Sequence, residues 1–323
     1  MYLVTGAAGF IGFHLCLRLL KHNQPVVGLD NINNYYNRKI KYDRLKILKK
    51  FRKFKFLKIN LNNKKNLESK IKKYKKKIEV IIHLAGQAGV RYSLINPIAY
   101  INDNILSYIH LLEVFKNSKK IKLILYASSS SIYGENFSEV SLSSKTQSNP
   151  ISIYSASKIS MELISKSYNA IYKLKFIGIR FFTVFGPWGR PDMFYYKLVK
   201  SIYKNKQINI FNFGNHKRSF TYIDDTIDNI IKIVNKFKSK KGNVCEVFNI
   251  GNPQSTNLKK FINIVEKKLN RKAKKKYIGR NIVEVIKTQA NIHRERKIFS
   301  HKIKFNLNSG IEKFIAWYKT YNK

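Results

Sequence analysis

The sequence predicts an α/β protein with a doubly wound parallel sheet, followed by a smaller C-terminal α/β lobe. Short apolar runs alternate with helix-like patterns through the first half of the 323 residues. After Arg180 the spacing becomes irregular and rich in Gly and Pro, as in residues 186–191. With 44% hydrophobic residues, the chain can bury a substantial core. We therefore expect one domain over residues 1–180 and a second over 181–323.

The expected strands are short and apolar throughout, as in parallel sheets that are covered on both faces. They lie at residues 2–4, 26–29, 54–57, 80–84, 123–126 and 176–179. Helix-like spacing is present at residues 10–21 and 224–236, and a strand near 246–250 is expected to return to the main sheet. The lysine-rich stretches 64–77 and 267–276 are interpreted as surface helices or adjoining loops.

A glycine-rich turn, residues 5–12 (TGAAGFIG), connects the first strand to the first helix. Glycines allow the backbone to approach a pyrophosphate closely, and the helix N-terminus offers free N–H groups. The second strand ends at Asp30, whose carboxylate can accept both ribose hydroxyls of NAD and would repel the extra phosphate of NADP. Together these features predict a Rossmann-like domain that binds NAD.

Tyr154 and Lys158 stand four residues apart, on one face of an expected helix. An ammonium near a phenol lowers the phenol's pKa, so Tyr154 is a candidate general base. In a chain this rich in Tyr and Lys, the spacing alone would arise by chance. Its position carries the prediction, because residues 128–131 are serines that follow strand 123–126, at the sheet edge where such folds bind ligands.

The GxxGxxG spacing and the 25 residues between Ser129 and Tyr154 resemble the extended short-chain dehydrogenase/reductase family of NAD-dependent epimerases and dehydratases. The resemblance runs nearly end to end. It implies that Ser129 hydrogen-bonds the reacting sugar oxygen, that Tyr154 is the base, and that Lys158 tunes Tyr154 and holds the nicotinamide ribose. Besides Tyr154 and Lys158, the implied NAD contacts are Gly6, Gly9, Phe10, Ile11, Gly12, Asp30, Asn31, Asn60, Leu61, Leu84, Ala85 and Gly86.

Within this family, residues 180–193 (RFFTVFGPWGRPDM) and 30–36 (DNINNYY) resemble the UDP-glucuronate 4-epimerases. The family's dehydratases and decarboxylase carry an acid beside the active serine or threonine, whereas this chain has Ser130 and Ser131 there. Without that acid, elimination lacks its proton carrier, whereas returning the hydride to the other face of a 4-keto sugar needs none. We therefore expect conversion of UDP-glucuronate to UDP-galacturonate, with a UDP-glucose/UDP-galactose 4-epimerase as the alternative.

The resemblance also assigns the substrate contacts. The hexuronate carboxylate is expected at Ser130, Ser131 and Thr183, the diphosphate at Arg190 and Arg218, and the substrate or diphosphate at Arg91. Glu284 falls where an aspartate usually meets the uridine ribose. Three places depart from the family pattern: Asn60 replaces the aspartate that reads adenine, Ser219 replaces an acid, and residues 281–285 replace a Pro-Gly-Asp turn.

The formal net charge of +45 raises the alternative of a nucleic-acid-binding protein on a dehydrogenase fold. Lysine is spread along the whole chain, however, and Asn, Ile, Tyr and Phe are also abundant. AT-rich codons encode these residues, so we interpret the charge as compositional drift and expect no specific nucleic-acid partner.

The remaining expectations concern location and assembly. No signal-peptide pattern precedes the first strand, and no apolar run is long enough to span a membrane. The two cysteines are far apart, which fits a reducing cytoplasm and predicts no metal cluster. The helices near 99–115 and 155–172 resemble those of the family's dimer interface, so a homodimer is expected.

Overall fold

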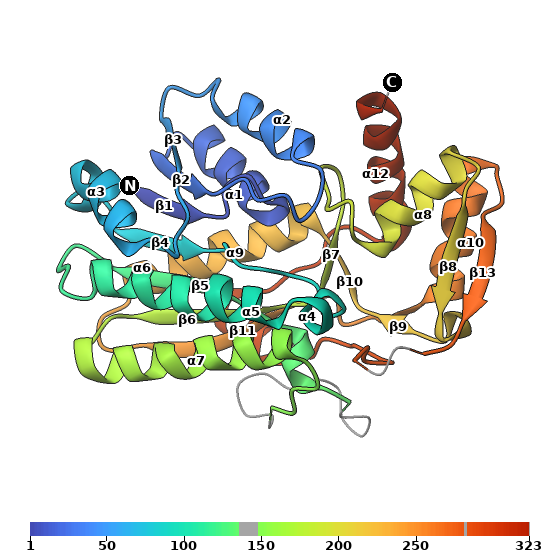
Figure 1. Cartoon of the computed structure of the whole chain (residues 1–323). Helices are drawn as coiled ribbons and strands as arrows, with labels where there is room; N and C mark the ends of the chain where they lie inside the picture. Colours follow the sequence, from blue (N-terminus) through green and yellow to red (C-terminus); the bar gives the residue numbers. More distant parts are fainter. Residues whose placement is uncertain (136–147, 281–282, 323) are drawn as a thin grey trace.

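A parallel sheet forms the centre of the computed structural model, which describes residues 1–135, 148–280 and 283–322. Within these residues, seven strands pair in the order β11-β6-β5-β4-β1-β2-β3 (Figure 1). Their bounds are β1 Tyr2–Thr5, β2 Val26–Asp30, β3 Phe54–Lys58, β4 Val80–His83, β5 Leu123–Ser129, β6 Phe176–Phe181 and β11 Cys245–Ile250. The strand order reverses between β1 and β4, so the predicted doubly wound α/β fold is confirmed.

Helices cover both faces of the sheet, which explains why its strands are apolar without alternation. Successive residues of one strand face opposite layers, so Val4 packs in one core cluster and Leu3 in the other. The first layer contains α1 (Phe10–Lys21), α2 (Lys39–Leu48) and α9 (Ile223–Lys238). The second contains α3 (Lys64–Lys75), α6 (Ser107–Phe115) and α7 (Ile153–Tyr172).

The connections after β4 and β5 form short helices at the edge of the sheet. They are α4 Tyr92–Ile95, α5 Pro97–Tyr100, the π-helical η1 Ile101–Leu106 and the 3₁₀ helix η2 Ser130–Tyr133. Because they follow the carboxyl ends of β4 and β5, they lie where a doubly wound sheet binds ligands.

The C-terminal half builds small sheets and helices beside that edge (Figure 1). Its paired strands are β7 Thr183–Phe185 with β10 Phe220–Tyr222, β8 Gln207–Phe211 with β13 Lys274–Ile278, and β9 Lys217–Arg218 with β12 Thr256–Asn257. Its helices are α8 Phe194–Tyr203, η3 Asn212–Gly214, α10 Leu258–Leu269, α11 His293–Phe299 and α12 Leu307–Tyr321.

The strand near 246–250 does return to the main sheet, as β11 beside β6. The interpretation of 267–276 as helix or loop is wrong in its second half, because Lys274–Ile278 forms β13, parallel to β8. Every residue of β13 is at least partly exposed, so the strand lacks the apolar alternation that would reveal it.

A buried ion pair joins β6 to α7 below the ligand-binding edge. Arg180 donates from Nε to Glu162 Oε1 at 2.9 Å and from Nη2 to Oε2 at 2.7 Å. Ser128 on β5 donates to the same carboxylate at 2.6 Å. Arg180 also donates to the Tyr133 hydroxyl, which in turn donates to Asn249 on β11. The carboxylate therefore ties strands β5 and β6 to helix α7, and Arg180 and Tyr133 extend the network to β11.

We predict that Glu162→Gln lowers the free energy of unfolding by about 3 kcal/mol or more, because it leaves a buried guanidinium without its counter-charge. Urea unfolding monitored by circular dichroism measures this change. The matched control is Glu312→Gln, since Glu312 pairs with Lys268 on the surface and is 71% exposed. That variant should change stability by less than about 0.5 kcal/mol. Equal losses in the two variants would contradict the prediction.

Candidate active site

A pocket of about 1090 Å³ lies at the carboxyl ends of the parallel strands, where the strand order reverses. Connections on either side of such a reversal diverge, so a crevice forms there. All of the catalytic, NAD-binding and substrate-binding residues predicted from the sequence line this one pocket. Residues from both halves of the chain contribute to it. The structure therefore brings the predicted set together, and the role of each residue follows from its local contacts.

The glycine turn after β1 forms one wall. Gly6 has a φ of +69°, which side-chain-bearing residues rarely adopt. A Cβ on Gly12 would lie 2.0 Å from the carbonyl oxygen of Gly6, so only glycine fits at that position. Helix α1 begins at Phe10 with Gly9 as its N-cap, and no side chain caps it. The turn thus presents bare backbone and the positive end of a helix to the pocket, which suits a diphosphate.

Asp30, at the end of β2, is held rigidly beside this turn. Its Oδ2 accepts the Ala8 N–H at 3.0 Å, and its Oδ1 accepts the Ile32 N–H at 2.8 Å. Each carboxylate oxygen can accept a further hydrogen bond, so the pair of ribose hydroxyls expected from the sequence can still be met. The glycine cradle and this fixed carboxylate fit an NAD molecule.

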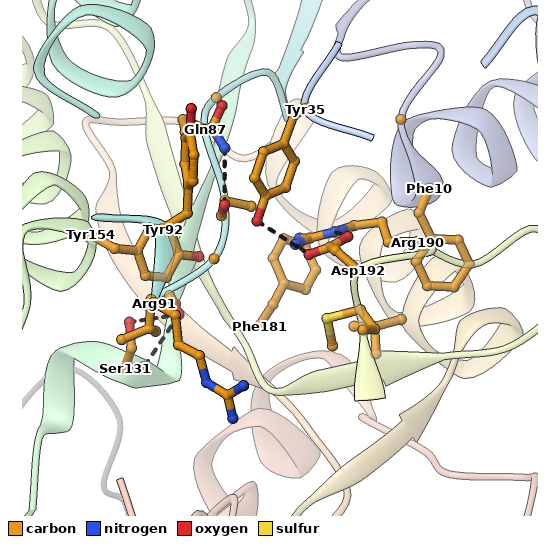
Figure 2. A pocket seen from close by; sticks show the side chains of 18 of the residues that line it. Phe10, Tyr35, Gln87, Arg91, Tyr92, Ser131, Tyr154, Phe181, Arg190 and Asp192 are labelled. Atoms are coloured by element: carbon orange, nitrogen blue, oxygen red, sulfur yellow. Dashed lines mark hydrogen bonds and ion pairs between the residues drawn. The ribbon is translucent and has the colours of Figure 1, made fainter. Parts of the chain in front are cut away.

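Ser129 and Tyr154 meet across the pocket floor. Ser129 ends β5, and Tyr154 lies in the first turn of α7, whose N-terminus is fixed by a capping box between Ser152 and Ser155. The Tyr154 phenol lies close enough to Ser129 for this serine to act on it and lower its pKa. Ser131 donates to the Ser129 hydroxyl at 2.9 Å, and Figure 2 shows Ser131 and Tyr154 on the same side of the pocket. A substrate oxygen that binds here would meet a phenol and a serine together.

The electrostatics of Tyr154 differ from the sequence prediction. Burial raises the pKa of Tyr154, and the hydrogen bond to Ser129 and the positive charge of Arg190 act in the opposite direction. Lys158 was expected to lower this pKa, but its Nζ lies 6.0 Å from the centre of the Tyr154 ring and contributes no such effect here. Arg190, which sequence analysis assigned only to the diphosphate, is the cation that acts on the phenol.

Lys158 is buried beside Gly86 in the pocket wall. Burial lowers its pKa to about 8. Among the described residues its Nζ donates only to the Met161 sulfur, at 3.6 Å. A weak sulfur acceptor leaves the ammonium's donors largely unused, so Lys158 can bind a polar group of a ligand.

Arg190 is fixed by an acid that sequence analysis did not single out. It donates from Nε to Asp192 Oδ1 at 3.0 Å and from Nη2 to Oδ2 at 2.5 Å. The hydroxyl of Tyr35 reaches across from the segment after β2 and donates to Asp192 at 3.4 Å (Figure 2). The sequence Arg190-Pro191-Asp192 could have predicted this ion pair, because side chains two residues apart can meet in a tight turn.

Arg91 and Glu284 form an ion pair between the two halves of the chain, with Nε to Oε1 at 2.5 Å. The Arg91 guanidinium also lies 3.5 Å from the centre of the Phe211 ring. Sequence analysis placed both charged residues at the substrate but did not predict that they pair. Glu284 lies just after residues 281 and 282 of the unusual 281–285 segment, which fall outside the described residues.

The other predicted residues occupy the pocket walls with local partners. Arg218 donates to the carbonyl oxygens of Lys217 and Ile286, and burial lowers its pKa to about 10. Ser219, where the family has an acid, donates to the Asn252 carbonyl oxygen at 2.7 Å. Ser219 is therefore a structural residue in this fold.

Two other kinds of site are absent from the described residues. No helix in that part of the chain combines the length and the apolar character needed to cross a bilayer. No group of three or more His, Cys, Asp or Glu side chains there is arranged to hold a metal ion.

Comparison with known proteins gives a consistent family. The NAD dependent epimerase/dehydratase family matches residues 2–251. The chain is 39% identical to protein CapI of Staphylococcus aureus, over 99% of each chain. It is 38% identical to UDP-glucuronate 4-epimerase 4 of Arabidopsis thaliana, over 99% of this chain and 75% of the relative. The structure of UDP-glucuronic acid 4-epimerase from Bacillus cereus, in complex with UDP-glucuronic acid and NAD, superposes with a TM-score of 0.91 at 31% identity, covering 99% of both chains.

Burial of Lys158 predicts a pH-dependent cost to stability. Burial lowers its pKa from the ordinary lysine value of 10.5 to about 8, so the folded state holds this proton less tightly than the unfolded chain does. The cost is fully present below pH 8 and disappears as the pH rises toward 10.5. Lys158→Met should therefore stabilise the protein without added dinucleotide by roughly 1–3 kcal/mol at pH 7.

Urea unfolding at pH 7 and at pH 10 tests this, and the stability gap between variant and parent should narrow at the higher pH. Lys319→Met, at an exposed position of α12, serves as the control and should show no pH-dependent gap. A Lys158→Met variant that is less stable than its parent at pH 7 would refute the prediction.

Proposed function

Because this chain belongs to the NAD dependent epimerase/dehydratase family, we propose that it interconverts UDP-glucuronate and UDP-galacturonate by epimerisation at carbon 4. It is an NAD-dependent epimerase, and its relatives and structural neighbours include UDP-glucuronate 4-epimerases. One observation carries the choice of reaction. Next to Ser129 and Tyr154 the site holds the hydroxyls of Ser130 and Ser131, where elimination would need an acid to carry a proton.

The residues of the pocket supply the proton chemistry. Bound NAD provides a reversible hydride acceptor. Tyr154 takes the proton from the hydroxyl on carbon 4 and returns it after the configuration has reversed, while Ser129 orients the reacting oxygen. Arg190 supports the phenolate form of Tyr154 through its positive charge. Lys158 holds the nicotinamide ribose with its unused donors.

The sugar is recognised by neutral groups and the diphosphate by arginines. The hydroxyls of Ser130, Ser131 and Thr183 line the pocket, and each can donate to a hexuronate carboxylate. Arg190 and Arg218 line the pocket and have guanidinium donors beyond those that bind Asp192 and the backbone carbonyls, and these donors can bind phosphate oxygens. We propose that residues 1–180 plus the returning strand β11 form the NAD-binding domain and that residues 181–323 form the sugar-nucleotide lobe. Ser130 and Ser131 of the first domain also reach the sugar.

We also propose a homodimer in the cytoplasm. Large apolar side chains are exposed on α5 and η1 and on the neighbouring helix α7, including Ile98, Ile101, Leu163 and Ile171. Adjacent helices with an uncovered apolar surface are typical of a subunit interface. A cytoplasmic location is supported by Cys16 and Cys245, which are free thiols.

The activity is tested by incubating the purified protein with NAD and UDP-glucuronate and resolving UDP-galacturonate by chromatography and mass spectrometry. We expect Tyr154→Phe to lower kcat by roughly two to four orders of magnitude, because it removes the general base. KM should change much less, since the group acts mainly in the transition state. UDP-glucose in the same assay tests the neutral-hexose alternative. Absence of UDP-galacturonate, or near-normal turnover by a folded Tyr154→Phe variant, would disprove the proposal.

The dimer is tested by light scattering at micromolar concentration, where the parent should have twice the chain mass of 37.9 kDa. Leu163→Glu combined with Ile171→Glu should shift the mass to that of a monomer, because it places charge on the proposed interface. Phe213→Glu is the matched control, since Phe213 is 55% exposed but lies on η3, in the C-terminal lobe. A monomeric parent, or equal effects of the control, would exclude this interface.

A further inference from the structure

The far end of the pocket must receive the adenine of NAD. Tyr154 and Lys158 mark the end where the chemistry occurs, beside Ser129 at the end of β5. The strand order β5-β4-β1-β2-β3 places the glycine turn after β1 between that end and the segment after β3. Beyond the turn, the pocket is lined by the segment after β3 and by η1 and α6. With the pyrophosphate at the turn and the nicotinamide near Tyr154, the adenine lies against these elements. This orientation rests on the NAD dependence stated above.

Asn60, at this end, uses its acceptor locally. Its Oδ1 accepts the N–H of Asn62 at 3.0 Å, which closes a turn of the backbone after β3. The Asn60 side chain is exposed. Its carbonyl oxygen already shapes this turn, and the lone pair that remains belongs to a neutral, exposed amide, which is a weaker acceptor for the amino group of adenine than a carboxylate.

Asp103, on η1, differs from Asn60 because one of its acceptor oxygens is left available for a ligand. It lines the same end of the pocket together with Leu61 and Ser107. Its Oδ1 accepts a hydrogen bond from the Asn62 side chain at 2.8 Å, which fixes the carboxylate. No described residue donates to its Oδ2. Asn62 therefore orients the acid by one oxygen, and the other oxygen remains available for a ligand.

The chemistry of the bases decides what this acid distinguishes. Adenine carries an amino group at position 6, which donates hydrogen bonds, whereas hypoxanthine carries a carbonyl oxygen there, which only accepts. An ionised carboxylate is also only an acceptor. A carboxylate accepts from the amino group of adenine and repels the carbonyl oxygen of hypoxanthine. The half-buried Asp103 therefore separates the two bases more strongly than a neutral amide would.

We propose that Asp103 recognises the amino group of adenine and makes the cofactor pocket select NAD over dinucleotides that carry hypoxanthine. Asn62 acts as its positioning residue. The selective acid thus comes from the helix after β4, whereas the sequence had pointed to the end of β3.

The test is a competition for binding that does not involve the sugar reaction. The full-length protein is equilibrated with equal concentrations of NAD and nicotinamide hypoxanthine dinucleotide, and the retained dinucleotides are quantified by mass spectrometry. The parent should retain NAD in about tenfold excess or more. Asp103→Asn should bring the ratio near one, because its amide can donate to the hypoxanthine oxygen. Asp103→Ser, which removes the acid without adding a donor on a long side chain, should also weaken the preference.

A matched control defines the outcomes. Glu68→Gln removes one acid from the exposed surface of the neighbouring helix α3. It should keep the parent's preference for NAD. If Asp103→Asn weakens retention of both dinucleotides equally, the acid contacts a part that they share, such as the ribose, and the proposal fails. It also fails if Glu68→Gln abolishes the preference. A change in the binding ratio supports the proposal whatever the sugar substrate proves to be.

Discussion

The buried contact between Arg180 and Glu162 is the constraint on which the catalytic geometry depends. Glu162 lies eight residues after Tyr154 and four after Lys158, so all three share one face of α7. Its carboxylate accepts from Ser128, the residue before Ser129. The Ser128–Glu162 hydrogen bond joins the residue before Ser129 to the helix that carries Tyr154. It therefore helps to fix the distance between the serine and the base. Since burial makes this bond sensitive to the loss of either charge, the site inherits the rigidity of the core.

Much of this architecture could be read from the sequence, because its signals are local. Apolar runs marked the strands of the main sheet, and residues 5–12 marked the diphosphate turn. The tertiary partners could not be read in this way. Arg91 and Glu284 are 193 residues apart, and Arg180 and Glu162 come from different elements. No periodicity relates such pairs. Because lysines are so frequent along the chain, their positions also do not show which of them have a tertiary partner. Strand β13 was missed for the same reason, since a surface strand of lysines carries no apolar pattern.

Charge is distributed unevenly between the surface and the pocket. The whole chain has only 18 acidic residues against 63 lysines and arginines. Four of these acids, Asp30, Asp103, Asp192 and Glu284, nevertheless line the pocket. Two of them pair with Arg190 and Arg91, so those arginines offer directed hydrogen bonds with much of their charge already balanced. A pocket of this kind can tell anionic ligands apart by geometry, which uncompensated charge would not do.

The close contact at Gly12 has a consequence for how the gene can change. Every glycine codon begins with two guanines, so a genome that drifts toward A and T tends to replace glycine by residues such as Lys and Asn. The chain keeps only 15 glycines in 323 residues. At Gly12 the Cβ of any side chain would lie 2.0 Å from the Gly6 carbonyl oxygen, so such a replacement would force the backbone of the turn to shift. The phosphate turn is therefore a place where mutational pressure and cofactor binding are directly opposed, and selection has to preserve guanines there one codon at a time.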